Sequence, residues 1–279
     1  MTTVQSPFEI VYEEEPQRVI RGQVERSQEA GDANLPWVLL VHGFKGFMDW
    51  GFFPLLSRGL AEAGFQVVRC NLSGSGVGAD LVDFSDLDSF TKDSYGRQLE
   101  DMQRVADLAA SGDLGPVEQE RCGYFGHSRG GGMGLVHAAG REYRGIVTWS
   151  AIDDADRFDD EAKEVWRRQG YLGVPNLRTG QEMRMGLDGL LEFEADPARF
   201  DILGAAARVQ APTLVLHGTA DQTVDPGAAG RIAAALPRGK SQLLDGAGHT
   251  LGATHPLQEV PPALAKALAL TVDHFLAHV

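Results

Sequence analysis

Short apolar runs alternate along the chain with longer segments in which apolar residues recur every three or four positions. Four of the short runs are apolar almost throughout: WVLLV, FQVV, GIVTW and TLVL. Strands without alternation are typical of a sheet that is covered on both faces. The longer segments predict helices. This order of elements predicts an α/β fold, with an open, mostly parallel central sheet and helices on both faces.

The pattern also gives the approximate bounds of each element. The expected strands are 8–12, 19–25, 37–42, 66–71, 121–126, 145–150, 213–217 and 241–244, and the expected helices are 53–63, 95–110, 130–139, 228–235 and 264–277. Only a short Glu-Glu-Pro turn separates the first two strands, so we expect them to form an antiparallel hairpin at the edge of the sheet.

One segment breaks the alternation. About 60 residues separate the strand that ends at Ser150 from the next strand, many more than a simple connection requires. We therefore expect one domain over residues 1–279, with residues 151–205 inserted as a cap. Trp166 and Tyr171 in this cap either serve as packing residues or line a substrate pocket, and in the second case their mutation should change substrate preference more than stability. Arg178 either ties the cap down, which is the role we favour, or binds a substrate carboxylate.

The composition is that of a folded globular protein. Of 279 residues, 43% are hydrophobic and 23% charged, which argues against a disordered chain. The formal net charge of −14 argues against nucleic acid or an anionic membrane as a partner. The first residues lack the basic and apolar regions of a signal peptide, and no apolar run approaches the ~18 residues of a membrane span. We expect a cytoplasmic protein with two buried free thiols, Cys70 and Cys122.

The segment Gly126-His-Ser128-Arg-Gly130 has the form G-x-S-x-G and lies between an expected strand and an expected helix of small residues. A serine at such a sharp turn is forced out of the sheet with its hydroxyl exposed, and the glycines permit the close approach of the backbone. A serine hydroxyl is a weak nucleophile unless a base and an orienting acid activate it. The segment therefore predicts Ser128 as a nucleophile and requires two partners elsewhere in the chain.

Two later segments supply the partners. Asp221 follows the strand expected at 213–217, and His249 follows the strand expected at 241–244. Catalytic groups of open α/β sheets gather at the carboxyl ends of strands, where all three side chains are expected to lie. Asp225 is a rival acid, and we prefer Asp221 because it is closer to the end of its strand.

The negative charge of a tetrahedral intermediate also requires hydrogen-bond donors. Phe44 follows the strand expected at 37–42, and its backbone N–H can point into the site. The backbone N–H of Arg129, directly after the nucleophile, is the natural second donor. The side chain of His42 is expected to pin this loop, so that the function of the loop resides in its backbone.

These motifs carry a family resemblance. With HGF at 42–44, GHSRG at 126–130, HGTADQTV at 217–224 and GAGH at 246–249, the chain resembles the α/β-hydrolase superfamily over nearly its whole length. The segment HGFKGFMDWGFF and the insertion after Ser150 look most like small bacterial esterases related to dienelactone hydrolases and cinnamoyl (feruloyl) esterases. The resemblance implies a Ser–His–Asp hydrolase that needs no cofactor, with a cap that shapes its pocket. Dienelactone hydrolases proper use cysteine where this chain has Ser128, which argues against their substrate.

We therefore expect a serine hydrolase that cleaves a small to medium, neutral carboxylic ester through an acyl-enzyme intermediate. The acidic residues at the start of the cap are expected to stay solvated and to disfavour anionic substrates. A thioesterase, an acyltransferase or a small-peptide hydrolase would use the same residues and stays open. A non-catalytic binding protein on the same scaffold also stays open. The expected partner is a small-molecule ester, and the chain is expected to be a monomer or a homodimer.

Two other segments resemble cofactor or metal sites only superficially. The glycine-rich stretch NLSGSGVG lacks the G-x-G-x-x-G spacing of a dinucleotide-binding loop. The aspartates between Asp80 and Asp88 lack the central glycine and terminal glutamate of an EF-hand calcium loop. We expect neither a cofactor nor a metal.

Overall fold

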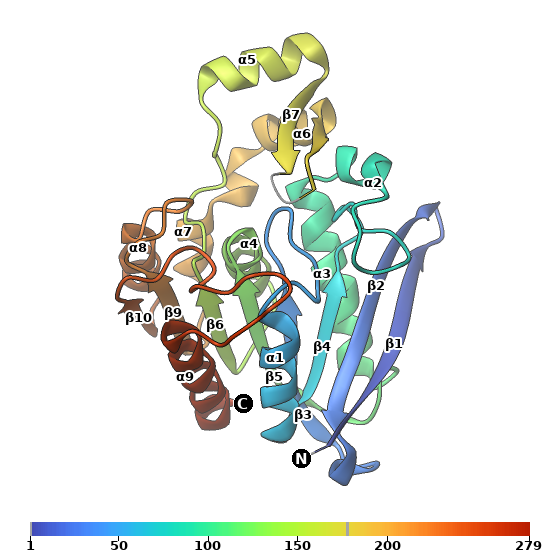
Figure 1. The fold of residues 1–279 in the computed structure, drawn as a ribbon, viewed down its shortest axis with the longest axis vertical. Helices are drawn as coiled ribbons and strands as arrows, with labels where there is room; N and C mark the ends of the chain where they lie inside the picture. The colour runs from blue at the N-terminus through green and yellow to red at the C-terminus, as the bar shows by residue number, and fades with distance from the viewer. Residues whose placement is uncertain (1, 177–178) are drawn as a thin grey trace.

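The computed structural model describes residues 2–176 and 179–279, which form a large sheet flanked by helices (Figure 1). In this part of the chain the main sheet has eight strands in the order β1-β2-β4-β3-β5-β6-β9-β10. The neighbours from β4 to β10 are parallel, whereas β2 pairs antiparallel with both β1 and β4. The mostly parallel sheet and the hairpin at its edge are thus both confirmed.

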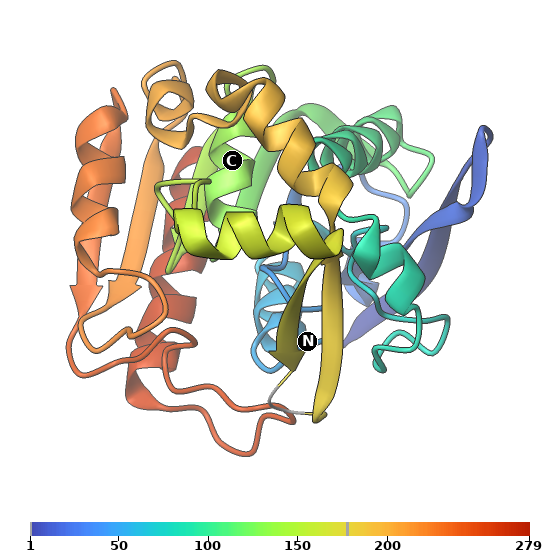
Figure 2. The same ribbon diagram turned by 90° about the horizontal axis from the view of Figure 1, so that it is seen from above.

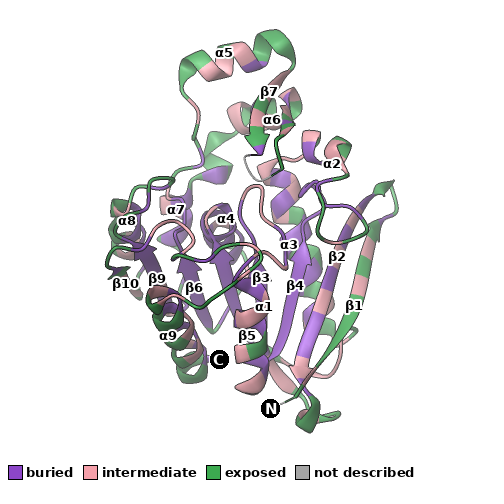
Figure 3. Cartoon of the chain, in the orientation of Figure 1, coloured by how far each residue is buried: buried purple, intermediate pink, exposed green. Residues whose placement is uncertain are grey.

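Each expected strand overlaps one strand of this sheet. The strands are β1 (Thr3–Tyr12), β2 (Glu15–Ser27), β3 (Leu35–Val41), β4 (Gln66–Asn71), β5 (Val117–His127), β6 (Gly145–Trp149), β9 (Thr213–Gly218) and β10 (Gly239–Leu244). The buried strands lie at the centre of the molecule, as Figure 3 shows.

The helices divide between the two faces of the sheet because alternate strand side chains point to opposite faces. On β3, Trp37, Leu39 and Val41 belong to one hydrophobic core, whereas Val38 and Leu40 belong to the other. The first core is covered by α3 (Tyr95–Ser111), α4 (Arg129–Ala138), α7 (Ile202–Ala206) and α8 (Gly227–Ala235). The second is covered by α1 (Phe53–Glu62) and α9 (Pro262–His278).

The segment after β6 rises above the carboxyl ends of the parallel strands (Figures 1 and 2). It contains α5 (Asp160–Gln169), a two-stranded sheet of β7 (Tyr171–Asn176) and β8 (Gln181–Gly186), and α6 (Leu187–Ala195). The hairpin was not anticipated from the sequence. Its buried residue Met183 packs with Phe47 and Phe84 from the loops that follow β3 and β4, and with Phe90 from the short helix α2 (Leu87–Thr91). The hairpin is thus attached to the main domain, whereas α5 is largely exposed (Figure 3).

Three short helices complete the described structure: η1 (Gln28–Ala30), α2 (Leu87–Thr91) and η2 (Pro197–Phe200). Both cysteines, Cys70 and Cys122, are buried free thiols, as expected. Among the described residues, no helix combines the length and the apolar character required to cross a membrane.

Candidate active site

Ser128 lies at the sharp turn between β5 and α4. Its backbone has φ 55° and ψ −118°, a conformation that residues other than glycine rarely adopt. A Cβ atom at Gly126 would lie 2.4 Å from the carbonyl oxygen of Gly130, and a Cβ at Gly130 would lie 2.4 Å from that of His42. Both flanking positions therefore require glycine, and the strained turn expected from G-x-S-x-G is present.

Asp221 follows β9 with its carboxylate fixed by four hydrogen bonds. Its Oδ2 accepts from His249 Nδ1 at 2.8 Å and from His217 Nε2 at 3.0 Å. Its Oδ1 accepts from the backbone N–H groups of Thr223 and Val224. Burial alone would raise the pKa of Asp221, but the hydrogen bonds outweigh it and hold this pKa well below its ordinary value. The carboxylate is therefore ionised and held in one orientation.

His249 lies in the loop after β10. Because Asp221 accepts its hydrogen bond, Nδ1 carries the proton and Nε2 keeps the lone pair that a general base needs. No hydrogen bond joins Ser128 Oγ to His249 in the described part of the chain, and such contacts are often long in ligand-free enzymes.

His127, the residue before the serine, connects the two loops. Its ring centroid lies 4.9 Å from that of His249, and its Nε2 lies 3.1 Å from the His249 carbonyl oxygen. Burial lowers the pKa of His127 to about 3, so the ring is neutral and can donate to that carbonyl through Nε2–H. The base is thus held beside the serine turn through its own backbone.

Asp225, the rival acid, lies elsewhere. It is exposed, accepts a hydrogen bond from the backbone N–H of Gly227, and forms an ion pair with Arg231 at 2.9 Å. Of the two aspartates considered from the sequence, the structure brings only Asp221 against His249.

The loop after β3 passes directly against the serine. A Cβ at Gly43 would lie 2.8 Å from Ser128 Cβ, which leaves no room for a larger residue. His42 fixes this loop, because its Nε2 accepts from the backbone N–H of Leu72 at 3.2 Å and its Nδ1 lies 2.8 Å from the Gly43 carbonyl. Burial lowers the pKa of His42 to about 4, so its role is that of a neutral structural residue.

The two expected oxyanion donors, Phe44 and Arg129, are in contact through their side chains. The Arg129 guanidinium carbon lies 3.9 Å from the centre of the Phe44 ring. Among the described residues, neither backbone N–H donates a hydrogen bond to a protein acceptor. Arg129 also forms an ion pair with Asp93 at 3.6 Å. Burial raises the pKa of Asp93 to about 7, although Arg129 and a hydrogen bond from Gln98 oppose the shift.

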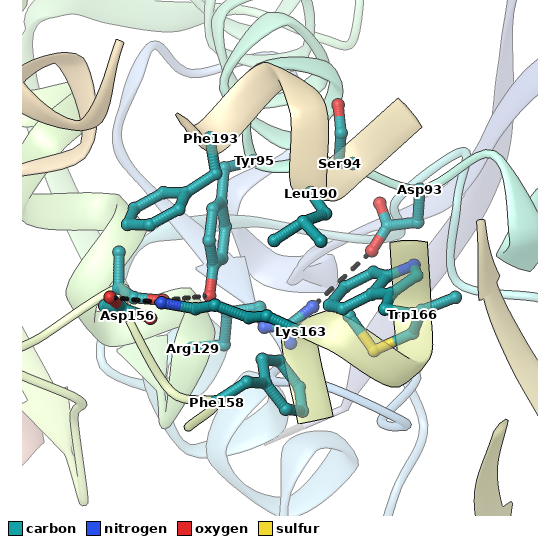
Figure 4. A pocket seen from close by; sticks show the side chains of 13 residues that line it. Asp93, Ser94, Tyr95, Arg129, Asp156, Phe158, Lys163, Trp166, Leu190 and Phe193 are labelled. Atoms are coloured by element: carbon teal, nitrogen blue, oxygen red, sulfur yellow. Dashed lines mark hydrogen bonds and ion pairs between the residues drawn. The ribbon is translucent and has the colours of Figure 1, made fainter. Parts of the chain in front are cut away.

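A pocket extends from Arg129 beneath the segment after β6 (Figure 4). Its lining is mainly apolar and aromatic and comprises Asp93, Ser94, Tyr95, Arg129, Ala155, Asp156, Phe158, Lys163, Trp166, Met185, Gly189, Leu190 and Phe193. The cavity volume is about 40 Å³, room for only a few water molecules, so a substrate must displace some of these side chains. Trp166 is among the residues that line this pocket.

Tyr171 is not among the residues that line this pocket. It starts β7, and cross-strand partners on a hairpin share one face. Val174 and Met183 occupy the buried face, so Tyr171 lies on the opposite one, where the Arg184 guanidinium carbon is 4.4 Å from its ring centre. Arg178, the other cap residue singled out from the sequence, lies outside the described residues.

The acidic start of the inserted segment is also less uniform than expected. Asp154, Asp159 and Asp160 are exposed, but Asp153 forms an ion pair with Arg231. Asp156 pairs with Lys163 at 2.7 Å and lines the pocket. Among the described residues, no group of three or more potential ligands from His, Cys, Asp and Glu is placed to hold a metal ion.

Most of the residues that line the pocket were not predicted, because they come from separate segments of the chain. Sequence reasoning used Arg129 only for its backbone and assigned no role to Asp93, Tyr95 or Lys163. Asp93 and Tyr95 follow the unexpected helix α2, and no local motif distinguishes them from ordinary surface or packing residues.

Comparisons with known proteins identify the family and the fold of the chain. The model of the prolyl oligopeptidase family matches residues 50–262. No curated protein matches the chain.

Among solved structures, DcsB in complex with its substrate analogue is similar at 14% identity, with a TM-score of 0.75 over 99% of this chain and 100% of that chain. Est1E from Butyrivibrio proteoclasticus is similar at 14% identity and a TM-score of 0.69, over 97% and 98% of the two chains, and has also been solved with ferulic acid bound. A dienelactone hydrolase from Anabaena variabilis is 17% identical, with a TM-score of 0.62 over 99% of each chain.

At these identities the solved structures establish the fold, and the family model covers most of the chain. The resemblance to the α/β-hydrolase superfamily seen in the sequence is thereby confirmed. The chain is a hydrolase with the α/β-hydrolase fold and belongs to the prolyl oligopeptidase family.

Proposed function

We propose that the protein is a serine hydrolase that cleaves a small to medium, neutral carboxylic ester through an acyl-enzyme intermediate. The observation that carries the proposal is the 2.8 Å contact between His249 Nδ1 and Asp221 Oδ2, next to a strained turn that presents Ser128. A turn of this kind costs of order 1–3 kcal/mol and persists where the surroundings enforce it, commonly at active sites.

In the proposed reaction, His249 Nε2 takes the proton of Ser128 Oγ as the oxygen attacks the ester carbonyl carbon. The backbone N–H groups of Phe44 and Arg129 donate to the oxyanion of the tetrahedral intermediate. His249 then returns the proton to the leaving alcohol, and an acyl group remains on Ser128. Water attacks this acyl-enzyme by the same route, while Asp221 stays ionised and stabilises the charged imidazole ring.

The pocket that begins at Arg129 supports an apolar and uncharged substrate group. Tyr95, Phe158, Trp166 and Phe193 supply aromatic surface around it. A flat hydrocarbon or aromatic group would be well matched to such walls. The binding of ferulic acid to the structurally similar Est1E is consistent with an aromatic acyl group here.

Hydrolysis of small peptides is the second candidate, because the family whose model matches is named for an oligopeptidase. The same serine, histidine and aspartate would serve amides and esters alike. Rates measured on an ester and an amide of the same acyl group separate the two candidates. We expect the ester to be cleaved and the amide to be cleaved far more slowly.

Ser128→Ala tests the proposal directly. Loss of the nucleophile should reduce the hydrolysis of p-nitrophenyl esters by several orders of magnitude and should abolish labelling by a fluorophosphonate probe. Ser111→Ala is the matched control, because this exposed serine at the end of α3 bonds only to its neighbours Leu108 and Asp113. An S128A variant that retains wild-type activity would refute the serine mechanism.

A further inference from the structure

The indole N–H of Trp166 has no hydrogen-bond partner among the described residues. The side chain is only 3% exposed, and its Nε1 atom is buried. A buried donor without a partner costs about 1–3 kcal/mol, and buried tryptophans usually find one. An unpaired donor in the wall of a cavity therefore marks a position where an acceptor is expected.

The ring that carries this donor is fixed in the wall of the pocket. Phe158 packs edge-on against it, with ring centres 5.4 Å apart. In Figure 4 the nitrogen edge of the indole lies on the side of the pocket occupied by Asp93. The helix that carries Trp166 is itself well terminated, with Asp159 capping its first turn and Gly170 in the left-handed conformation at its end. The ring and its N–H thus have a defined position in the wall of the pocket.

The charges around the pocket indicate which kind of acceptor fits. Arg129 is paired with Asp93 at 3.6 Å, and Lys163 is paired with Asp156 at 2.7 Å. Both cations that line the described pocket therefore already have a carboxyl partner, which reduces their attraction for an anion, and the carboxylate of Asp156 would repel one. An uncharged oxygen can accept from Trp166 without this repulsion.

We propose that Trp166 Nε1 donates a hydrogen bond to an uncharged oxygen (an ether, hydroxyl or carbonyl) carried by the apolar substrate group that fills this pocket. The inference rests on the proposed function, because the pocket adjoins Arg129, the residue after Ser128. Trp166 is then a specificity residue that distinguishes an oxygen-bearing group from a hydrocarbon of the same shape. It takes no part in bond making.

Isosteric pairs of esters test the inference. The p-nitrophenyl esters of 3-(4-methoxyphenyl)propanoic and 3-(4-ethylphenyl)propanoic acid differ by one oxygen in place of one methylene, and the 3-substituted pair moves that oxygen along the ring. For at least one pair, wild-type kcat/KM should favour the methoxy ester by about 3- to 10-fold, the effect expected of one neutral hydrogen bond. Trp166→Phe retains an aromatic ring but removes the donor, so it should bring this ratio close to one.

Trp50→Phe is the matched control. Trp50 is partly buried and packs on Phe52 and His255, outside the pocket, so its replacement should leave the methoxy-to-ethyl ratio unchanged. A ratio near one in wild type for both pairs, or a ratio that Trp166→Phe leaves unaltered, would overturn the inference. A melting curve for each variant establishes that the ratio is measured on folded protein.

Failure of the proposed function gives a different result. In that case wild type would hydrolyse neither ester of a pair, and binding would be measured instead. Calorimetry with the corresponding 3-arylpropan-1-ols should still show tighter binding of the methoxy alcohol to wild type and equal binding of both alcohols to Trp166→Phe. Equal binding of the two alcohols to wild type would overturn the inference by this route as well.

Discussion

Replacing Asp221 with asparagine tests the arrangement of the acid and the base most sharply. The Asp221 Oδ2 atom accepts from two rings, His249 Nδ1 and His217 Nε2, while Oδ1 accepts from two backbone N–H groups. Asparagine has only one oxygen. If that oxygen stays with the backbone donors, its NH₂ group faces the two ring N–H groups. The His249 ring can then accept at Nδ1 only by moving its proton to Nε2, where it can no longer accept a proton from Ser128.

The expected loss follows from this change of tautomer. The equivalent change in another serine hydrolase triad lowers kcat by about 10⁴, which corresponds to about 5 kcal/mol at 1.36 kcal/mol for each factor of ten. KM should change little, because Asp221 is covered by His217 and His249 and does not line the pocket. Steady-state hydrolysis of a p-nitrophenyl ester measures both constants.

Asp225→Asn provides a control with the same chemical change four residues along the chain. Asp225 is exposed and pairs with Arg231, and such surface pairs contribute little, so kcat should stay within about 3-fold of wild type. An Asp221→Asn variant that retains a tenth or more of wild-type kcat, or a greater loss in Asp225→Asn, would refute the assignment of Asp221 as the orienting acid.

Three further results are expected. Gly43→Ala should lower kcat by about 10- to 100-fold in a folded protein, measured with the same ester, because the new methyl group would displace Ser128. Asp93 has a pKa of about 7 in the folded chain but near 3.9 when unfolded, so the folded state binds more protons between these two pH values. The free energy of unfolding should therefore fall as pH rises from about 4 to about 7. In Asp93→Asn, the urea midpoint of unfolding should fall less over this pH range. The pKa of Asp221 is depressed instead, so the contribution of its carboxylate to the free energy of unfolding should be lost as pH falls below about 4. Asp221→Asn has no such carboxylate, so its free energy of unfolding should decrease less than that of wild type over the same fall in pH.

The sequence predicts the main sheet well because its strands are buried on both faces. Gln66–Asn71 has the expected bounds at both ends, since every residue of β4 is buried and Val67, Val68 and Cys70 form an apolar centre. The start of β5 was missed by four residues. Val117–Glu120 carries mostly polar and exposed side chains and pairs with β3 only through Val117 and Leu35, a contact that no local pattern reveals.

The β7–β8 hairpin shows where local pattern is insufficient. Gly173 and Pro175 are poor strand formers and interrupt any alternation of apolar and polar residues in β7. The hairpin is stabilised instead by contacts of Val174 and Met183 with aromatic residues about a hundred positions earlier in the chain. Such long-range packing outweighs the low strand propensity of these residues, and a short window of sequence does not reveal it.

The candidate catalytic residues were accessible to sequence reasoning for the opposite reason. Ser128, Asp221 and His249 each sit in a short turn after a strand, and the conformation of that turn demands specific small residues. The Gly126 and Gly130 positions admit no side chain, so the requirement for glycine is visible in the short motif around Ser128. The pocket has no comparable local constraint, because Asp93, Trp166 and the other lining residues meet only after the chain has folded.

Arg129 is the point at which the two parts of the site meet. Its backbone N–H is a proposed oxyanion donor, whereas its guanidinium lies in the pocket wall, over the ring of the second proposed donor residue, Phe44, and against Asp93. In the proposed reaction, a group bound in the pocket therefore contacts the side chain of a residue whose backbone N–H faces the reacting carbonyl. Because a cation held over an aromatic ring and paired with a carboxyl group has little freedom, this side chain would place the substrate group and the proposed oxyanion donors relative to one another. The same arrangement would explain a charged residue in an otherwise apolar pocket: Arg129 would orient the proposed donors, and its pairing with Asp93 would reduce the attraction of its charge for an anionic substrate.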